Sequence, residues 1–291
     1  MAKQFLVVNS FTGKHGIGNP AAIFCDSSGL NDQQMQAIAM QLNLVETVFV
    51  FPAEDADFTF RYFTPNKEVP VAGHPTVAAC IALVHTNKIN PANKSSIYIH
   101  TADGVREVRI EENVDSVYIK MKQVEPSFPS IASDRKEVAE ILGIEEQDLL
   151  IDYPVQAVDL GLKHLIVPVK SLERLMAIKR NISPLKQLCV DLGVDEVQAF
   201  TFETYSNHAT LHTRNICPRE GLEDPACGIG NAALGAYLCR MQEFIGKSII
   251  AEQGNAVDMP CDIEVEIGKQ GDIWIGGTGK LMIQGEYLAI E

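Results

Sequence analysis

The pattern of apolar and polar residues along the chain predicts many short strands and few helices. Runs of about four to eight apolar or alternating residues indicate strands. They cover residues 4–11, 21–26, 46–52, 56–63, 96–101, 105–111 and 116–122, and later 164–169, 196–203 and 280–290. Amphipathic periodicity predicts helices over 31–43, with Asn31 as its N-terminal cap, and over 183–193.

Two further segments are apolar on every side. They read HPTVAACIALV after Gly73 and GIGNAALGAYLC after Cys227. A helix of this composition is buried all round. Because strands far outnumber helices, we expect an α+β fold of two similar domains, each a curved, mostly antiparallel sheet wrapped around one central buried helix.

The two apolar segments follow sequences that resemble each other. Residues 61–73 and 214–228 each begin with an arginine, followed four positions later by a proline and then by acidic residues and a glycine turn. This internal repeat predicts two halves related by a pseudo-twofold axis, with a small ligand held between the two glycine turns. The helix N-termini at these turns offer backbone N–H groups and partial positive charge to an anion such as a carboxylate.

The expected domains follow from the repeat and from composition. The first covers residues 1–122 and the second covers 130–279, separated by the proline- and serine-rich segment 123–133. The last strand, within 280–291, is expected to return and pack on the first domain.

Charge and composition exclude several classes of protein. The 291 residues include 24 basic and 38 acidic side chains, and the net charge of −14 argues against nucleic acid or an anionic membrane as partner. There is no run of 18 apolar residues and no cationic signal peptide, so a cytoplasmic location is expected. The seven cysteines form no C-x-x-C pair, which favours reduced thiols over disulfides or structural zinc.

Two candidate catalytic residues lie in the first half. Glu46 opens an apolar strand at the rim of a core, where desolvation would raise its carboxyl pKa toward that of a useful base, although a solvated strand end has the same pattern. His74 lies in a glycine–proline turn at the start of a buried helix. There it could relay a proton as a neutral imidazole, or simply cap the helix.

Two more candidates lie in the second half. Asp224 precedes Pro225, which is also typical of an ordinary helix N-cap. Cys227 lies at a helix start, where the helix dipole lowers a thiol pKa, although a small buried thiol fits the position equally well. The repeat places all four groups at the seam between the halves, and titratable groups that cluster in a cleft are typical of catalytic sites.

Several motifs together resemble the PhzF-like family, the phenazine-biosynthesis isomerases and their relatives. They are R-x-F-T-P-x-x-E-V-P-x-x-G-H-P-T at 61–76, N-S-F-T-x-x-x-x-x-G-N-P at 9–20, V-E-T at 45–47 and E-D-P-A-x-G at 223–228, in order over nearly the whole chain. The resemblance implies the diaminopimelate epimerase fold, with the active site between two similar domains. It also makes a homodimer plausible.

The resemblance implies roles for individual residues. Glu46 matches the family's general acid/base, which acts in a cofactor-free proton shift on a small cyclic carboxylic acid. His74 and Asp224 match the other polar active-site positions, and no metal, flavin or pyridoxal is implied. The turn at Gly18, Asn19 and Pro20, together with Gly73 and Gly228, is expected to shape the substrate site and to offer it backbone N–H groups. Cys227 is expected to line the same site.

The chain departs from the family pattern beside its second glycine turn. Cys227 and Ile229 stand where the family often has threonine and serine, which puts the family's founding reaction in doubt here. Cys227-Gly228 resembles the second catalytic Cys-Gly of diaminopimelate epimerases and proline racemases, but Ala72 occupies the first such position and excludes a symmetric two-thiol racemase. The alternatives to a Glu46 isomerase are a one-thiol epimerase using Cys227, a non-catalytic protein that binds a small acid, and a redox-sensing thiol protein.

Overall fold

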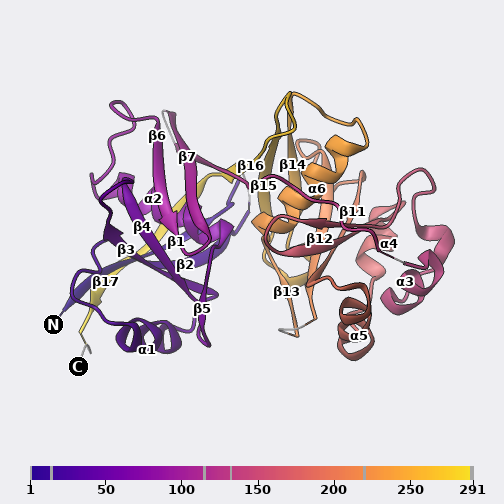
Figure 1. The fold of residues 1–291 in the computed structure, drawn as a ribbon, viewed down its shortest axis with the longest axis horizontal. Helices are drawn as coiled ribbons and strands as arrows, with labels where there is room; N and C mark the ends of the chain where they lie inside the picture. The colour runs from indigo at the N-terminus through magenta and orange to yellow at the C-terminus, as the bar shows by residue number, and fades with distance from the viewer. Residues whose placement is uncertain (1, 14–15, 114–115, 132, 219–220, 289–291) are drawn as a thin grey trace. The chain divides into compact units, whose positions relative to one another are not determined.

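The computed structural model describes residues 2–13, 16–113, 116–131, 133–218 and 221–288. The chain forms two compact units (Figure 1). The first unit joins Met1–Lys122 with the C-terminal segment Gly276–Glu291, and the second unit is Gln123–Ile275.

Among its described residues, the first unit has nine strands and two helices. The strands are β1 (Lys3–Ser10), β2 (Asn19–Phe24), β3 (Glu46–Pro52), β4 (Phe58–Phe63), β5 (Glu68–Val69), β6 (Ser96–Thr101), β7 (Gly104–Asn113), β8 (Ser116–Lys122) and β17 (Gly279–Tyr287). The helices are α1 (Asp32–Leu42) and α2 (Gly73–His85).

The strands of the first unit pair in the order β17-β1-β2-β3-β4-β6-β7-β8, with β5 added beside β4. The β2/β3 and β4/β6 pairs are parallel, and the other pairs are antiparallel. The C-terminal strand β17 pairs with β1, so the last segment of the chain completes the sheet on which the first segment lies. Residues 289 and 290 of the expected last strand lie outside the described residues.

Helix α2 lies against β1, β2, β3 and β8 and is buried from Gly73 to Leu83. Its side chains are mostly apolar, and the polar His74 and Thr76 are buried with them, so the prediction of a helix buried all round is confirmed. Helix α1 covers a different part of the sheet through Met35, Ile38 and Ala39. Asn31 caps α1 as predicted, and its side chain accepts a hydrogen bond from Gln34 N.

The second unit is also rich in strands, with four helices among its described residues. The strands are β9 (Gln156–Asp159), β10 (Lys163–Pro168), β11 (Glu196–Thr201), β12 (Leu211–Cys217), β13 (Leu222–Asp224), β14 (Lys247–Gln253) and β15 (Cys261–Ile267); β16 (Ile273–Gly277) ends in the first unit. The helices are α3 (Arg135–Leu142), α4 (Leu172–Ala177), α5 (Ile182–Leu192) and α6 (Gly228–Arg240), with short 3₁₀ turns at Glu146–Asp148 and Asn255–Val257.

The strands of the second unit pair in the order β9-β10-β11-β12-β14-β15, with β13 added beside β12. The β10/β11 and β12/β14 pairs are parallel and the others are antiparallel. From β9 to β15 the pairings are thus antiparallel, parallel, antiparallel, parallel and antiparallel. The strands β1-β2-β3-β4-β6-β7 of the first unit pair in the same sequence of directions.

Helix α6 is the buried helix of the second unit and lies against β9, β10, β11 and β15. Of its residues from Gly228 to Leu238, only Ile229 is not fully buried. Gly235 permits a close approach to β15, because a Cβ atom there would lie 2.6 Å from Cγ1 of Val265. Helices α3 and α5 enclose a separate apolar core with β10 and β11.

The observed architecture is a mixed α and β structure dominated by strands, as the sequence predicted. Among the described residues, no helix is long and apolar enough to cross a membrane.

Candidate functional site

Glu46 and His74 lie together in the first unit. Glu46 is the first residue of β3, and His74 is the second residue of α2. Their side chains bring Oε2 of Glu46 to 3.3 Å from Nε2 of His74, with 15% of the Glu46 side chain and 5% of the His74 side chain exposed. The structure thus joins two residues that the sequence singled out 28 positions apart.

Burial determines the charge of His74. It lowers the pKa of the imidazole from its ordinary value of 6.5 to about 3, against the smaller opposing effect of a hydrogen bond to the backbone of Pro20. Proline has no backbone N–H, so the ring must donate this bond to the Pro20 carbonyl. Because a neutral imidazole has a single N–H, the ring nitrogen that faces Glu46 is an acceptor at neutral pH.

The turn at Gly18, Asn19 and Pro20 supports this pair from β2. Gly18 has φ +82°, and a Cβ atom there would lie 2.7 Å from the carbonyl oxygen of Ser10, so only glycine fits without strain. Asn19 is buried at the start of β2, and Pro20 lies opposite Asn9 across the β1/β2 pair.

The N-terminus of α2 contains no side-chain cap. Ala72 is the N-cap residue and makes no side-chain capping bond, so the alternative role of His74 as the helix cap is wrong. Gly73 is the first residue of α2. Like the other N–H groups of the first turn, its backbone N–H has no carbonyl partner within the helix.

Asp224 lies at the end of β13, in the turn that leads to α6. Its Oδ1 accepts a hydrogen bond from Ala226 N at 2.9 Å, and Gln253 Nε2 donates to its carbonyl oxygen at 2.7 Å. Burial raises the pKa of Asp224 to about 6, with a further contribution from the charge of Glu196. The helix N-cap is Cys227, so the alternative of Asp224 as an ordinary cap is wrong.

Cys227 supplies the capping bond itself. Its Sγ accepts a hydrogen bond from Gly230 N at 3.3 Å, and its carbonyl oxygen accepts one from Asn231 Nδ2 at 2.9 Å. Gly228 follows as the first residue of α6. The thiol is 7% exposed, so it lies at a buried helix N-terminus, as the sequence predicted.

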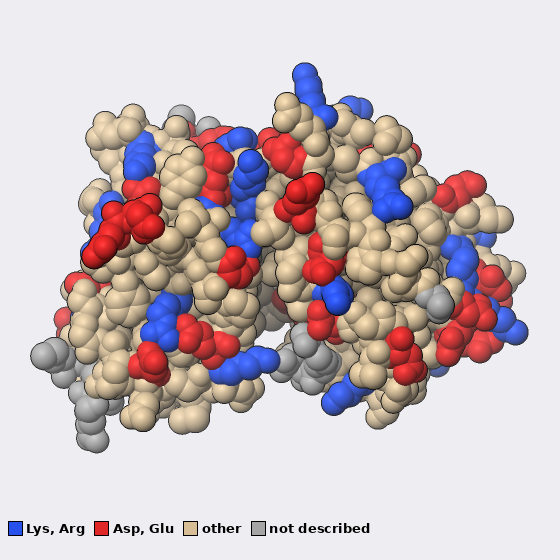
Figure 2. Space-filling model, viewed as in Figure 1, with Lys and Arg blue, Asp and Glu red and all other residues tan. Residues whose placement is uncertain are grey.

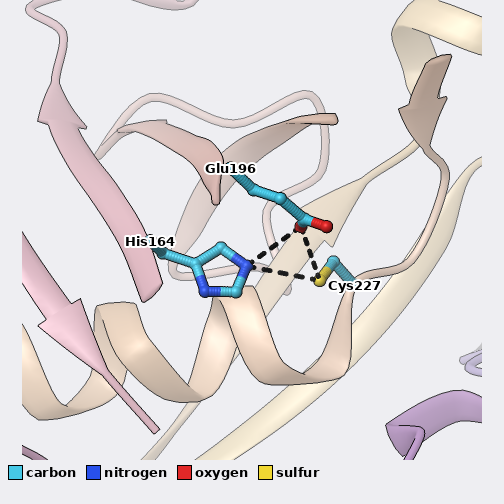
Figure 3. Close-up of side chains that lie close together, drawn as sticks. All are labelled: His164, Glu196 and Cys227. Atoms are coloured by element: carbon cyan, nitrogen blue, oxygen red, sulfur yellow. Dashed lines mark hydrogen bonds and ion pairs between the residues drawn. The ribbon is translucent and has the colours of Figure 1, made fainter. Parts of the chain in front are cut away.

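His164 and Glu196 complete a cluster around this thiol (Figure 3). His164 lies on β10, Glu196 opens β11, and the two residues lie opposite each other in the parallel pairing of these strands. Nε2 of His164 is 3.1 Å from Oε2 of Glu196 and 3.8 Å from Sγ of Cys227. Burial would raise the pKa of Glu196, but the hydrogen bond and charge of His164 outweigh it, and the net effect is a lowered pKa.

Sequence reasoning missed His164 and Glu196. The signal for Glu196 was present, because this residue opens an apolar strand as Glu46 does, and the segments 46–52 and 196–203 correspond in the internal repeat. In the first unit, His74 contacts both Glu46 and the backbone of Pro20. In the second unit, Asp224, Cys227 and Gly228 follow one another along one turn. That all of them serve one substrate stays a prediction.

The buried carboxyl of Asp224 predicts a pH dependence of stability. Because its pKa is about 6 in the fold and 3.8 ordinarily, the folded protein holds the proton more tightly, and this group's contribution to stability falls as pH rises from about 4 to 7. The total loss is about 3 kcal/mol. We expect Asp224→Asn, which keeps the acceptor for Ala226 N, to be more stable than the wild type at pH 8 and nearly equal to it at pH 4, measured by urea unfolding.

An exposed acidic residue provides the control for this prediction. Asp258 lies outside the cluster and is exposed to solvent. Asp258→Asn should therefore change stability by the same small amount at both pH values. A gap between wild type and Asp224→Asn that does not widen with pH would contradict the assigned protonation.

Acidic and basic side chains are interspersed over the face shown in Figure 2, and Lys and Arg form no broad patch on that face.

Comparison with protein families gives one match over nearly the whole chain. The sequence model of the family described as phenazine biosynthesis-like protein (PhzC-PhzF) matches residues 8–285. Among similar sequences, the uncharacterized isomerase YfhB of Bacillus subtilis is 33% identical over 270 residues, which cover 92% of each chain.

Solved structures give the same result. The chain is similar to the PhzF-family phenazine biosynthesis protein of Bacillus anthracis, at 30% identity, 99% coverage of each chain and a TM-score of 0.86. A hydroxyproline epimerase from Agrobacterium vitis has a TM-score of 0.64 at 15% identity, covering 100% of this chain and 93% of the other, and this likeness shows the epimerase-like fold alone.

Proposed function

Because the chain belongs to the phenazine biosynthesis-like family, we propose that it is an isomerase that moves a proton between carbon atoms of a small carboxylic acid, with Glu46 as general acid and base. The observation that carries this proposal is the buried Glu46–His74 pair, 3.3 Å apart at the N-terminus of α2. The names of relatives support the reaction class, since YfhB of Bacillus subtilis and YddE of Escherichia coli are both called uncharacterized isomerases.

The protonation of the pair suits a proton transfer. The His74 nitrogen that faces Glu46 is an acceptor, and the carboxylate is another, so the proton that Glu46 takes from the substrate can be held between them until it is returned. In the proposed reaction the Glu46 carboxylate takes a proton from carbon beside the substrate carboxylate or enamine, and the same carboxyl group returns it to another carbon. His74 stays neutral and orients Glu46.

The helix N-termini supply the remaining requirement. Removal of a proton from carbon places negative charge on the substrate oxygens, and fixed N–H groups stabilise that charge without reorganisation. We assign this role to the backbone at Gly73 and Gly228, each the first residue of a buried helix. The turn at Gly18, Asn19 and Pro20 shapes the substrate site, and Asp224 is its further polar group.

We also propose that the two units are copies of one domain. Each has the same series of strand pairings, described above, and each buried helix begins with the same internal bond. Thr76 Oγ1 donates to Ala72 O at 2.7 Å, and Asn231 Nδ2 donates to Cys227 O at 2.9 Å. An arginine–glutamate pair with two parallel hydrogen bonds precedes each helix.

A second candidate function uses the thiol. Cys227 lies 3.8 Å from His164 Nε2 at a helix N-terminus, where a thiolate is favoured. In this one-thiol epimerase, Cys227 would exchange a proton with one face of the substrate carbon, and Glu46 or His74 would serve the other face. Both candidates predict hydrogen exchange at carbon, and they differ in which side chain is indispensable.

Exchange of substrate protons for deuterium tests the proposal. A panel of small cyclic and amino carboxylic acids is incubated with the protein in heavy water and followed by proton NMR. We expect loss of one carbon-bound proton signal from at least one acid, and none in samples with heat-denatured protein. Acids that bind, as shown by line broadening, but do not exchange would instead support a non-catalytic binding protein.

A further inference from the structure

The cluster of His164, Glu196 and Cys227 has a geometry that the proposed reaction does not explain. The three side chains come from β10, β11 and the N-cap of α6, and their donor atoms converge on one point (Figure 3). One nitrogen, one oxygen and one sulfur atom all lie within 4.8 Å of one another, inside a single unit of the chain.

The orientation of His164 distinguishes this cluster from a proton relay. In a cysteine–histidine–carboxylate relay, one ring nitrogen faces the thiol and the other faces the carboxylate. Here Nε2 faces both, at 3.8 Å from Sγ and 3.1 Å from Oε2. Nδ1 lies 3.1 Å from the carbonyl oxygen of Leu162, to which it must donate.

Because Nδ1 donates its hydrogen to the carbonyl oxygen, the other nitrogen of the neutral ring, Nε2, has its lone pair directed at Glu196 Oε2 and Cys227 Sγ. This is the tautomer and the support that histidine ligands of metal ions usually have. A carboxylate oxygen and a sulfur atom meet the same point. In the metal-free protein the Cys227 thiol donates toward Glu196 Oε2 at 4.0 Å; once this proton and any proton on Nε2 leave, three lone pairs converge on one point at which a cation can bind.

The distances fit a tetrahedral zinc ion. With bonds of about 2.3 Å to sulfur and about 2.0–2.1 Å to nitrogen and oxygen, tetrahedral ligands lie about 3.3 Å apart for nitrogen and oxygen and about 3.5 Å apart for sulfur and either partner. The observed separations are 3.1 Å for nitrogen–oxygen, 3.8 Å for sulfur–nitrogen and 4.0 Å for sulfur–oxygen. Shifts of a few tenths of an ångström would complete the coordination.

We propose that His164, Glu196 and Cys227 bind a thiophilic divalent cation of the zinc class, with the fourth position open to water or a small carboxylate. A thiolate and an imidazole together favour such a cation over magnesium or calcium, which prefer oxygen ligands. The proposal does not depend on the isomerase reaction.

Charge and burial agree with this assignment. Binding converts the Cys227 thiol to a thiolate and releases one proton, so the two ligand charges of Cys227 and Glu196 neutralise the cation. The His164 side chain is fully buried and 12% of the Glu196 side chain is exposed, so the ion would be held largely out of water. The hydrogen bond from Gly230 N to Sγ also favours the thiolate.

The second unit contains a matched pair without the thiol. Nδ1 of His212 lies 3.1 Å from Oε2 of Glu252, and both side chains are buried. A site that only required a buried histidine and glutamate would form there as well. The inference rests on the addition of Cys227, which gives the cluster its third ligand.

Cobalt binding tests the proposal directly. Reduced, metal-free protein is titrated with Co²⁺, and a thiolate-to-cobalt charge-transfer band at one equivalent is expected. Cys227→Ala and His164→Ala should lose the band and weaken Zn²⁺ binding at least roughly 100-fold in competition with a chelator. Cys239→Ala, on the same helix, and His212→Asn should leave both unchanged. Circular dichroism checks that each variant folds.

A second measurement uses the wild type alone and does not depend on the folding of any variant. Iodoacetamide labelling, mapped by mass spectrometry, should be slowed at Cys227 by one equivalent of Zn²⁺ and unaffected at Cys25 and Cys239, the two partly exposed cysteines. Absence of the cobalt band, a band that survives in Cys227→Ala, or labelling of Cys227 that zinc does not slow would overturn the proposal.

Discussion

Glu46→Gln is expected to reduce hydrogen exchange at the substrate carbon about 10²–10⁴-fold, the usual contribution of a general acid or base. The substitution removes the group that accepts the proton and preserves its shape. The fold should be retained, because the new amide N–H can donate to the His74 nitrogen that lies 3.3 Å from Oε2 in the wild type. The rate is measured as kcat/KM for deuterium incorporation, with thermal unfolding as the check on structure.

An exposed glutamate of the same unit is the matched control. Glu54 follows β3 in a turn and faces solvent, so Glu54→Gln makes the same chemical change outside the pair. It should exchange at the wild-type rate. Wild-type exchange by Glu46→Gln would exclude Glu46 as the acid/base.

The same assay separates the two candidate mechanisms. If Glu46 alone moves the proton, Cys227→Ser should change kcat/KM by much less than Glu46→Gln does. If the thiol serves one face of the carbon, Cys227→Ser should be as damaging as Glu46→Gln, because racemisation requires a group on each face. Cys239→Ser, in the last turn of α6, controls for loss of a thiol.

Much of the fold could be predicted from the sequence because the strongest signals are local. The side chain of Asn31 and its bond to Gln34 follow from a capping sequence four residues long. The segments after Gly73 and Cys227 are apolar on every side, so neither helix has a polar face that could point to solvent, and both could be predicted to be buried. Glu46 was a candidate because a carboxylate that begins an apolar strand can lie at the edge of a core, and the structure places it there with 15% of its side chain exposed.

The cluster around Cys227 could not be predicted in the same way. His164 and Glu196 are 32 positions apart, and they meet only because β10 and β11 pair in a parallel register that places the two residues opposite each other. No local pattern determines that register. The roles of Asp224 and Cys227 at the helix start depend on side-chain geometry, since either residue type can accept a bond from the first turn of a helix.

The largest expected effect on stability comes from Arg214. Its guanidinium makes two hydrogen bonds to Glu223, at 2.9 and 2.8 Å, and only 5% and 1% of the two side chains are exposed. It also donates to the carbonyl oxygens of Leu175 and Ile178, both at 3.0 Å, at the end of α4. Arg214→Met would leave a buried carboxylate and these carbonyl groups without their donor, and we expect a loss of about 3–5 kcal/mol in the free energy of unfolding.

The first unit provides a comparison of the same pair in water. Arg61 makes two hydrogen bonds of 2.7 Å to Glu68 and one to Asp32, but 28% of its side chain and 37% of that of Glu68 are exposed. Solvent screens these charges and can replace the lost hydrogen bonds. Arg61→Met should therefore cost no more than about 1 kcal/mol.

Urea unfolding of the two variants measures the difference, and a double variant identifies its source. If the cost of Arg214→Met is the uncompensated charge of Glu223, then adding Glu223→Leu should restore part of the lost stability. Recovery should be incomplete, because the carbonyl groups at the end of α4 still lack a donor, and because Arg180, 3.7 Å from Glu223 Oε2, loses its carboxylate partner. Equal costs for Arg214→Met and Arg61→Met would show that burial does not set the strength of these pairs.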